Sequence, residues 1–372
     1  MREKKKLAII VISISAFIVI ATALTLFLVE LFTTPSLGLI EYKLDGYKYQ
    51  IEITNSNILG GDACFYIPSN GKEINIPEEI TVKHGMFSEK YIINEIYFDY
   101  DFYANGKDLD PNCLKTNIIV PKTVSSIRKK GFRKYTYAKF NDENIDFFVS
   151  NVGRISVASD NPYFDSREDS NCIIETKTDK IIISGLKNTK IPSTVKEIGS
   201  FAFWLIDAKE ITIPSNVKKI NSLAFMECSY LKKITIEEGV EEISSFAFVG
   251  SSCFYAGYEA FDTKIDELYI PSTIKEISAN SFALFDTPYM KIYYNGSDFK
   301  SLLKDYTGWS QRSIGFYGPG YNSRYEQVSD GYFNIYGAED IYEGTIYLYS
   351  ENAPETDGLY WHYVDGKITV WE

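Results

Sequence analysis

A short motif recurs three times in the middle of this 372-residue chain. The copies share the form Ile-Pro-Ser-x-Val-x-x-Ile-x-x-x-Ala-Phe, with Glu-Glu in place of Pro-Ser in the third, and run over Ile191–Phe203, Ile213–Phe225 and Ile236–Phe248. Their second residues are 22 and 23 positions apart. Recurrence at one short period predicts a stack of repeated coils, in which each coil contacts only its neighbours.

Weaker copies extend the array in both directions. The same phase appears at Pro121 and Pro271, and less clearly at Pro77 and Asp99. A strand of the form apolar-x-x-apolar-x-apolar recurs in the array, at Ile93–Phe98, Val152–Val157, Leu231–Ile236 and Tyr289–Tyr294. These positions predict about eight to ten coils between Ile74 and Asn295.

Each part of the motif has a physical task. In the strand, alternate apolar residues point inward and the residues between them point outward. The proline stops further pairing, and the Val and Ile after it are expected to start a second short strand on the opposite wall. The Phe is expected to fill the interior in a short helical or 3-10 turn, so that stacked coils build an apolar column.

Two coils are longer than the others, at 34 residues each. Asn161–Ile181 has turn residues followed by β-branched runs, which predicts an inserted hairpin. Val249–Thr263 is rich in Gly, Ser and aromatic residues and is interpreted as an extended loop. Insertions in a repeat array project from it and are frequent places for specific contacts.

The amino-terminal segment has the composition of a membrane anchor. Residues 1–6 contain four basic side chains, and the apolar run Leu7–Val29 is long enough to cross a bilayer core of about 30 Å. The positive flank predicts a cytoplasmic amino terminus, with the remaining chain outside. A cleaved signal peptide is the alternative, because Ala21–Ala23 has the form of a cleavage site.

Charge and cysteine usage exclude some classes of function. The chain carries a net charge of −12, and beyond Glu30 it holds 34 basic and 48 acidic residues, which disfavours a nucleic-acid partner. Its cysteines are an odd, widely spaced set without a CxxC motif, so neither zinc nor another cofactor is predicted: Cys64, Cys113, Cys172, Cys228 and Cys253. We expect buried thiols, with Cys228 facing the core.

The repeat resembles the BspA-like leucine-rich-repeat family of bacterial surface proteins. The passage Asn161–Thr176, with Cys172 where Ala is frequent, and the end Tyr349–Trp371 also resemble segments of that family. The resemblance covers roughly Ile74 to Glu372 and implies a leucine-rich-repeat solenoid, mainly β with short turns, located at the cell surface. It further implies adhesion or protein binding without catalysis. The degenerate coils before Asn161 and the amino-terminal helix depart from the family pattern.

Both ends of the array are interpreted as caps. Residues 35–73 contain the alternating segments Tyr42–Leu44 and Tyr47–Ile53 around Asp45-Gly46, which predicts a capping hairpin in front of the solenoid at 74–297. Residues 298–372 form the predicted carboxy-terminal β-rich cap. Four aromatic residues there are assigned to the cap, with a sugar-stacking platform as the alternative: Tyr360, Trp361, Tyr363 and Trp371.

No pattern of catalytic residues is present. The two histidines, His84 and His362, are far apart in the sequence, and neither is marked by a catalytic motif. The acidic pairs Glu237-Glu238 and Glu241-Glu242 occupy turn and outer-wall positions, so they are interpreted as a solvated face and not as glycosidase carboxylates. Phosphate-loop, dinucleotide, zinc-protease and calcium-loop spacings are missing. We therefore predict a protein that is not an enzyme.

These observations favour a membrane-anchored, outward-facing solenoid that binds another macromolecule, most simply a protein. The predicted contact surface is the sheet wall, whose outward residues form two columns: Asn188, Glu210, Lys233 and Glu267 beside Lys190, Thr212, Thr235 and Tyr269. An envelope scaffold without a specific ligand and carbohydrate binding through the aromatic tail are the alternatives. A one-chain signalling receptor is disfavoured, because six residues before the membrane span leave no room for an effector.

Overall fold

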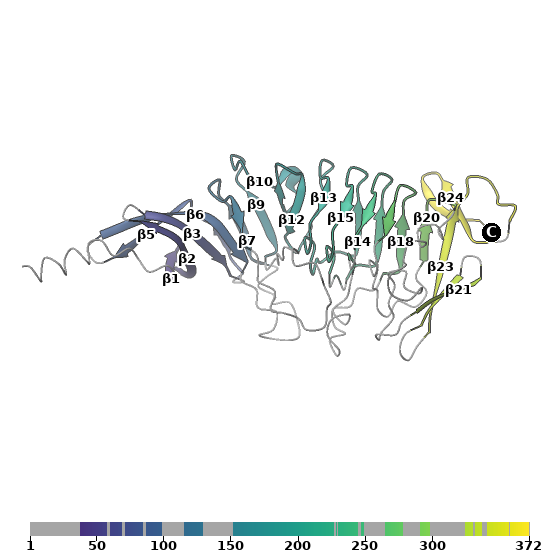
Figure 1. The fold of residues 1–372 in the computed structure, drawn as a ribbon, viewed down its shortest axis with the longest axis horizontal. Helices are drawn as coiled ribbons and strands as arrows, with labels where there is room; N and C mark the ends of the chain where they lie inside the picture. The colour runs from purple at the N-terminus through teal and green to yellow at the C-terminus, as the bar shows by residue number, and fades with distance from the viewer. Residues whose placement is uncertain are drawn as a thin grey trace, which may run out of the picture. The chain divides into compact units, whose positions relative to one another are not determined.

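The computed structural model of the chain describes residues 38–57, 60–68, 71–84, 87–98, 115–128, 152–226, 228, 230–244, 247–248, 265–277, 291–297, 324–329, 332–336, 341–356 and 358–371. The chain divides into two compact units, one of Met1–Tyr66 with Pro77–Ile96 and one of Ile67–Ile76 with Tyr97–Glu372 (Figure 1). Strands dominate both units. Within the described residues, helical geometry is limited to short 3-10 stretches, of which Arg167–Asp169 is the one with described bounds.

The first unit is built on an antiparallel sheet. Its strands follow the order β1-β2-β3-β6-β5, and their bounds are β1 (Gly38–Leu44), β2 (Tyr47–Asn57), β3 (Gly60–Ile67), β5 (Glu79–His84) and β6 (Phe87–Phe98). One face carries the buried core of this unit, which includes Ile51, Ile53, Phe65, Ile80, Tyr91 and Ile93. The predicted turn at Asp45-Gly46 is confirmed, with φ of 50° and 81° at these two residues.

The sheet differs from the predicted organisation in one respect. The solenoid strand placed at Ile93–Phe98 is wrong, because this segment ends β6, which forms an antiparallel hairpin with β5, in which Ile80 lies opposite Tyr91. Alternation with one buried face is the pattern of an antiparallel sheet. The predicted hairpin of residues 35–73 is thus not an isolated element, since β1 and β2 continue into this larger sheet.

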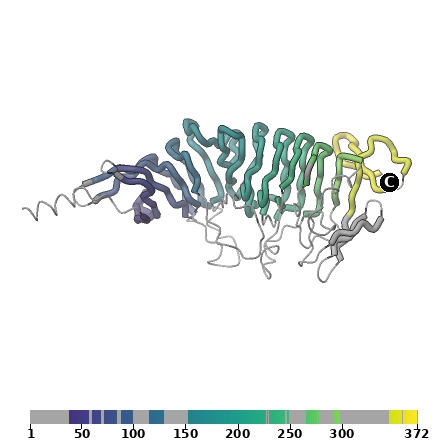
Figure 2. Tube along the Cα trace, in the orientation of Figure 1, coloured from purple at the N-terminus to yellow at the C-terminus, as the bar shows by residue number. Residues whose placement is uncertain are grey.

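The first wall of the second unit consists of parallel strands. β4 (Glu73–Asn75), β7 (Asn117–Val120) and β9 (Arg154–Val157) form one ladder. A second ladder contains β14 (Glu210–Ile213), β16 (Lys233–Ile236), β18 (Glu267–Ile270) and β20 (Lys291–Tyr294). The predicted strands ending at Val157, Ile236 and Tyr294 are confirmed. Figure 2 shows these coils side by side in sequence order, from blue through teal to green.

The second wall contains the short strands expected after each proline. β13 (Glu197–Ile198), β15 (Lys219–Ile220), β17 (Glu242–Ile243) and β19 (Glu276–Ile277) pair in parallel. β8 (Ser126–Ile127) follows Pro121 at the same spacing in the sequence but is not part of this ladder. β10 (Phe164–Asp165), β11 (Cys172–Glu175) and β12 (Lys180–Ser184) precede them, with β11 and β12 antiparallel. The inserted hairpin at Asn161 is therefore confirmed, and β12 joins it to the wall through β13.

The last part of the unit extends the first wall. β23 (Ile341–Tyr349) pairs in parallel with β20, and β22 (Tyr332–Tyr336) and β21 (Arg324–Ser329) follow it antiparallel. β23 also pairs in parallel with β24 (Tyr360–Val364), and β24 forms an antiparallel hairpin with β25 (Lys367–Val370). These five strands and β14, β16, β18 and β20 thus form one nine-stranded sheet.

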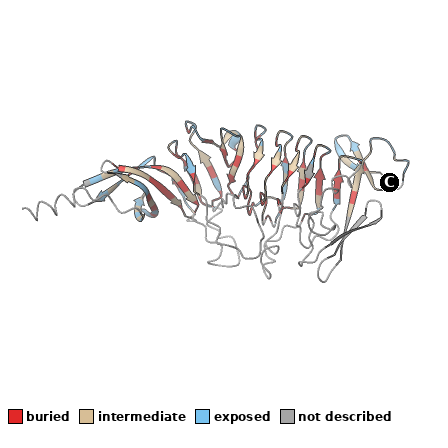
Figure 3. Cartoon of the chain, in the orientation of Figure 1, coloured by how far each residue is buried: buried red, intermediate tan, exposed pale blue. Residues whose placement is uncertain are grey.

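The phenylalanine column is present between the two walls. Phe203, Phe225 and Phe248 are fully buried, and their ring centroids are 4.9 and 4.8 Å apart with nearly parallel planes. The buried core continues along the coils between the walls, as the red segments of Figure 3 show. The plugs at Phe203 and Phe225 lie in turns and not in helices. The amides of Ala202 and Ala224 donate to the carbonyls three residues earlier, whereas the amides of Phe203 and Phe225 donate to Ala224 and Ala247 of the next coil.

Three cysteines lie in the described part, and all are buried: Cys64, Cys172 and Cys228. Cys228 belongs to the core cluster, as predicted, and its Sγ donates to the Phe203 carbonyl at 3.1 Å. Burial raises the pKa of the Cys172 thiol. The described segments contain no helix with the length and apolarity needed to cross a bilayer. The predicted span Leu7–Val29, the loop Val249–Thr263, Asp99, Cys113 and Cys253 lie outside the described residues.

Candidate binding surface

The outward residues of the first wall form two straight columns. Parallel pairing places Glu210, Lys233, Glu267 and Lys291 opposite one another, and we call this row the charge column. The hydroxyl column beside it consists of Thr212, Thr235, Tyr269 and Tyr293. In-register parallel strands bring each residue about 4.8 Å from its equivalent, so a repeated sequence becomes a repeated surface. Six of the eight predicted residues therefore share one face.

Neighbouring charges along the charge column alternate in sign. Lys233 Nζ lies 3.4 Å from a carboxylate oxygen of Glu267, and the Tyr269 hydroxyl donates to the same carboxylate at 2.8 Å. The ammonium group also lies 5.0 Å from the centre of the Tyr269 ring. The side chains of Lys233 and Glu267 are partly exposed, so solvent screens this ion pair and its contribution to stability is small. The alternation makes this face locally neutral, in a chain whose net charge is strongly negative.

An aromatic cluster covers one end of the hydroxyl column. Tyr269 and Tyr293 stack at 4.7 Å, Tyr293 stacks on Tyr347 at 5.1 Å, and Trp361 meets Tyr293 edge-on. Tyr269 points outward as predicted, but it is only 8% exposed because it belongs to this cluster with Tyr293 and Trp361. Burial, followed by the charge of Glu267, raises the pKa of Tyr293 to about 12. The open part of the columns is therefore at β14 and β16, where Thr212 is exposed and Thr235 half-buried.

The four aromatic residues of the tail do not share one face. Trp361 and Tyr363 are two positions apart on β24 and contact each other, whereas Trp371 stacks on the intervening His362 at 3.8 Å. Trp361 is 2% exposed, and its Nε1 donates to the Tyr294 carbonyl at 3.0 Å. The tyrosines of the column turn their ring faces toward one another, so these faces are not open to a sugar. This geometry supports the cap over the sugar platform.

Asn188 and Lys190 do not continue the columns. Asn188 has a φ of 53°, which interrupts an extended strand, and the segment meets the next coil through the bridge between Lys187 and Asp207. Asn171 of the inserted hairpin contacts the segment that contains Asn188, because its Nδ2 donates to the Lys187 carbonyl at 2.5 Å. Both predicted residues are exposed but lie outside the β14 ladder.

Sequence reasoning missed four members of the columns. Lys291 and Tyr293 lie on β20, and Thr345 and Tyr347 on β23 continue the two rows. The strand pattern ending at Tyr294 contained the signal for the first two, since residues between its apolar positions must point outward. Nothing in the repeat phase signalled Thr345 and Tyr347, because β23 follows a break in the repeats.

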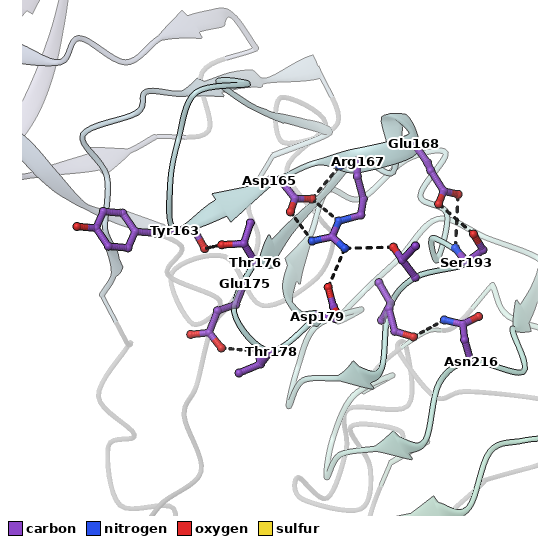
Figure 4. Close-up of polar contacts among 12 residues, drawn as sticks. Tyr163, Asp165, Arg167, Glu168, Glu175, Thr176, Thr178, Asp179, Ser193 and Asn216 are labelled. Atoms are coloured by element: carbon purple, nitrogen blue, oxygen red, sulfur yellow. Dashed lines mark hydrogen bonds and ion pairs between the residues drawn. The ribbon is translucent and has the colours of Figure 1, made fainter.

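The inserted hairpin is held by an arginine-centred network (Figure 4). Arg167 donates Nε and Nη2 to the two carboxylate oxygens of Asp165, at 2.8 and 2.5 Å, and Nη1 to Asp179 at 2.7 Å. The same Nη1 reaches Thr194 at 3.2 Å in the first clear repeat. Bidentate pairing fixes the guanidinium orientation and ties the hairpin to the solenoid. Tyr163 points away from this network and is 51% exposed.

The paired glutamates of the third repeat join adjacent coils. Glu237 accepts the Ser215 amide at 3.0 Å, and Glu238 accepts the Ser272 amide at 2.8 Å and the Asn295 side chain at 2.5 Å. Glu168 similarly accepts the Ser193 hydroxyl at 3.1 Å. These carboxylates thus satisfy turn amides that follow a proline. The contacts assign Glu237 and Glu238 a structural role.

The glutamate contacts predict a loss of stability at acid pH. Burial raises the pKa of Glu238, but hydrogen bonds from Ser272 and Asn295 lower it more, and the net value lies below the ordinary 4.5. Glu197 shows the same balance, with burial opposed by contacts to Lys180 and Asn221. A lowered folded-state pKa stabilises the fold above the unfolded-state value, and this stabilisation is lost as pH falls through the folded-state value.

We therefore expect the urea midpoint to fall below about pH 4.5, the unperturbed carboxyl range. Urea titrations between pH 7 and pH 3 would measure this fall. Glu238→Gln should lower the midpoint at pH 7 and flatten its dependence on pH, and Glu351→Gln in an exposed turn serves as the control. Equal pH profiles for wild type and Glu238→Gln would contradict the assigned role.

Neither histidine is placed in a catalytic arrangement by the described contacts. His84 ends β5 in the first unit, and His362 stacks on Trp371 in the second. Within the described ranges, no three His, Cys, Asp or Glu side chains gather in a way that could hold a metal ion. The candidate surface itself is formed by the outward residues of the first-wall strands.

Parallel strands on two walls, coils of 22 to 23 residues and a stacked apolar column define a repeat solenoid. The family model for the BspA type leucine rich repeat region matches six copies, over residues 49–139 and 182–285. The chain belongs to the BspA type leucine-rich-repeat family. The resemblance read from the repeats is therefore confirmed, and the matched copies begin earlier than Ile74. No curated protein matches the chain by sequence.

Solved structures of low sequence identity resemble the chain. The pneumococcal vaccine antigen PcpA is 13% identical, over 70% of this chain and 83% of its own, with a TM-score of 0.35. A leucine rich cell surface protein from Faecalibacterium prausnitzii is 17% identical, over 81% and 60%, with a TM-score of 0.30. A leucine-rich repeat protein from Bacteroides ovatus is 18% identical, over 71% and 65%, with a TM-score of 0.25.

Proposed function

We propose that this protein is a membrane-anchored surface protein that binds another protein through the open end of its first wall. Membership of the BspA type family supports a general role at the cell surface in binding other macromolecules. The apolar run Leu7–Val29 and its basic flank support a single span with the solenoid outside. We propose no catalytic role.

One observation carries the choice of surface. The charge and hydroxyl columns form a regular face on rigid strands, and at β14 and β16 this face is open, with Glu210 and Thr212 exposed. At β18 and β20 the aromatic cluster covers the hydroxyl column. A flat face with hydroxyl groups and paired charges of both signs suits the polar surface of a protein partner. Asn188 and Lys190 extend the proposed contact from the adjoining segment.

The test is the double variant Thr212→Arg with Thr235→Arg. Both side chains lie outside the core, so the fold should persist, whereas two adjacent arginines would obstruct a partner on the wall. We expect binding to a partner identified by pull-down with the detergent-solubilised chain to weaken at least about tenfold. Thr81→Arg with Thr369→Arg, in β5 and β25, makes the same chemical change elsewhere. Unchanged affinity of the wall variant would exclude this surface.

The anchor is tested separately. We expect the intact amino terminus in the mature protein and extraction from membranes by detergent but not by carbonate. Mass spectrometry of the amino-terminal peptide measures the first, and fractionation measures the second. A mature protein that begins after Ala23 would show a cleaved signal peptide instead.

A further inference from the structure

Strand β1 ends the sheet of the first unit. Its one strand partner among the described residues is β2, which it meets from Gly38 opposite Ile53 to Leu44 opposite Tyr47. The other edge of β1 therefore presents main-chain donors and acceptors that no described strand pairs. An edge of this kind is a template for adding a strand from another chain.

The turn determines which main-chain groups face outward. Asp45 and Gly46 form a two-residue loop, so the flanking pair of Leu44 and Tyr47 is a hydrogen-bonded pair. Hydrogen-bonded and non-bonded pairs alternate along an antiparallel ladder. The backbones of Leu44, Tyr42 and Ile40 thus bond to β2, and those of Lys43, Glu41 and Leu39 point to the free edge.

The core face of β1 is incompletely covered. Ile40 and Tyr42 are half-buried, while Ile51 and Tyr49 opposite them on β2 are 0% and 4% exposed. Exposure therefore rises from β2 to β1 on the same face. A further strand against β1 would bury these two side chains and Leu44.

The charges on the outer face of β1 are also unbalanced. Lys43 lies directly opposite Lys48, a like-charge pair that weakens a ladder. The nearby carboxylate of Glu41 pairs with Lys48, at 2.9 Å from its Nζ. No ion pair to Lys43 occurs in the described part of the chain. A carboxylate opposite Lys43 from a neighbouring strand would offset this repulsion.

We propose that β1 pairs with β1 of a second copy, antiparallel and centred on Tyr42. In this register Glu41 of each copy lies opposite Lys43 of the other, and Ile40 lies opposite Leu44, so charges and apolar groups both match. The outward backbones of Glu41 and Lys43 then form the hydrogen-bonded pairs, as the ladder requires. Centring on Glu41 would put two glutamates opposite each other, which favours the Tyr42 register.

Disulfide trapping tests the register in the full chain in detergent micelles. Tyr42 faces itself across a non-bonded pair, where Cα atoms are about 4.5 Å apart, within the range that a disulfide spans. We expect Tyr42→Cys to give a covalent dimer under mild oxidation, and Thr81→Cys on β5, at the other end of the sheet, to give none. Trapping through Glu41→Cys but not Tyr42→Cys, or equal trapping at both ends of the sheet, would overturn the proposal.

Charge reversal tests the pairing without cysteine. Lys43→Glu places a carboxylate opposite Lys48, so the protomer should keep its thermal stability, while the dimer gains two repulsive pairs. We expect the dissociation constant of the dimer, measured by sedimentation equilibrium, to rise about tenfold. Adding Glu41→Lys restores opposite charges across the axis and should restore the dimer. A monomeric wild type, or a double variant as weak as Lys43→Glu, would overturn the proposal.

Discussion

Phe225→Ala is expected to lower the free energy of unfolding by about 3 to 5 kcal/mol, the range for truncating a buried phenylalanine. Phe225 is fully buried, and its ring lies between Phe203 and Phe248, at centroid distances of 4.9 and 4.8 Å. Truncation removes two ring contacts at once and leaves a cavity in the middle of the column. Because each coil is stabilised by its neighbours, the loss affects both adjoining coils. Urea unfolding of the full chain, followed by circular dichroism, measures it.

Two further variants establish the cause of this loss. Phe225→Leu keeps an apolar group in the column and should cost clearly less than Phe225→Ala. Tyr230→Ala removes a ring that is 62% exposed and should change the free energy of unfolding by no more than about 0.5 kcal/mol. A loss below about 1 kcal/mol for Phe225→Ala would show that Phe225 does not support the column.

The solenoid could be predicted because the repeated residues are the buried ones. Val195, Val217 and Val240 recur at equivalent places and are all 0% exposed, as are Ile198 and Ile220 after them. The core accepts only a narrow range of volumes at each level of the stack, so apolar residues recur there at a constant period. Strand bounds on both walls follow from the same residues.

The first unit could not be predicted in the same way. The segment Ile93–Phe98 has the apolar spacing of a solenoid strand, and Ile93, Ile96 and Phe98 are indeed buried. Alternation reports which residues face a core, but not whether the neighbouring strand is parallel or antiparallel. The partner of β6 is set by the β5–β6 hairpin, whose turn carries no strong signal in the sequence.

The candidate surface was predicted in position but not in exposure. Glu210, Lys233 and Glu267 align because the strands of successive repeats are in register, and the period alone implies this. Whether Tyr269 is open depends on β24, which is more than 90 positions away in the sequence. Asn188 does not join the charge column for a local reason, because its positive φ ends the extended conformation.

Trp361→Ala is expected to cost about 3 to 5 kcal/mol, because a large buried side chain is removed from the aromatic cluster. Trp361 is 2% exposed, meets Tyr293 and Tyr349 edge-on at 6.1 and 5.2 Å, and donates its Nε1 hydrogen to the Tyr294 carbonyl. The change should also uncover Tyr293, whose pKa would fall from about 12 toward its ordinary value of 10. Urea unfolding measures the loss of stability, and an NMR titration of ring-labelled tyrosine measures the pKa.

The control is a tryptophan of the same tail that lies outside the aromatic cluster. Trp371→Ala removes a half-buried ring on the opposite face of the same hairpin, which stacks on His362 and donates to Ser350, so it should cost less and leave the pKa of Tyr293 unchanged. Trp361→Phe keeps a ring in the cluster but loses the bond to Tyr294, and its stability should fall between wild type and Trp361→Ala. If Trp361→Ala and Trp371→Ala cost the same and Tyr293 kept its raised pKa, Trp361 would not be the residue that closes this end of the hydroxyl column.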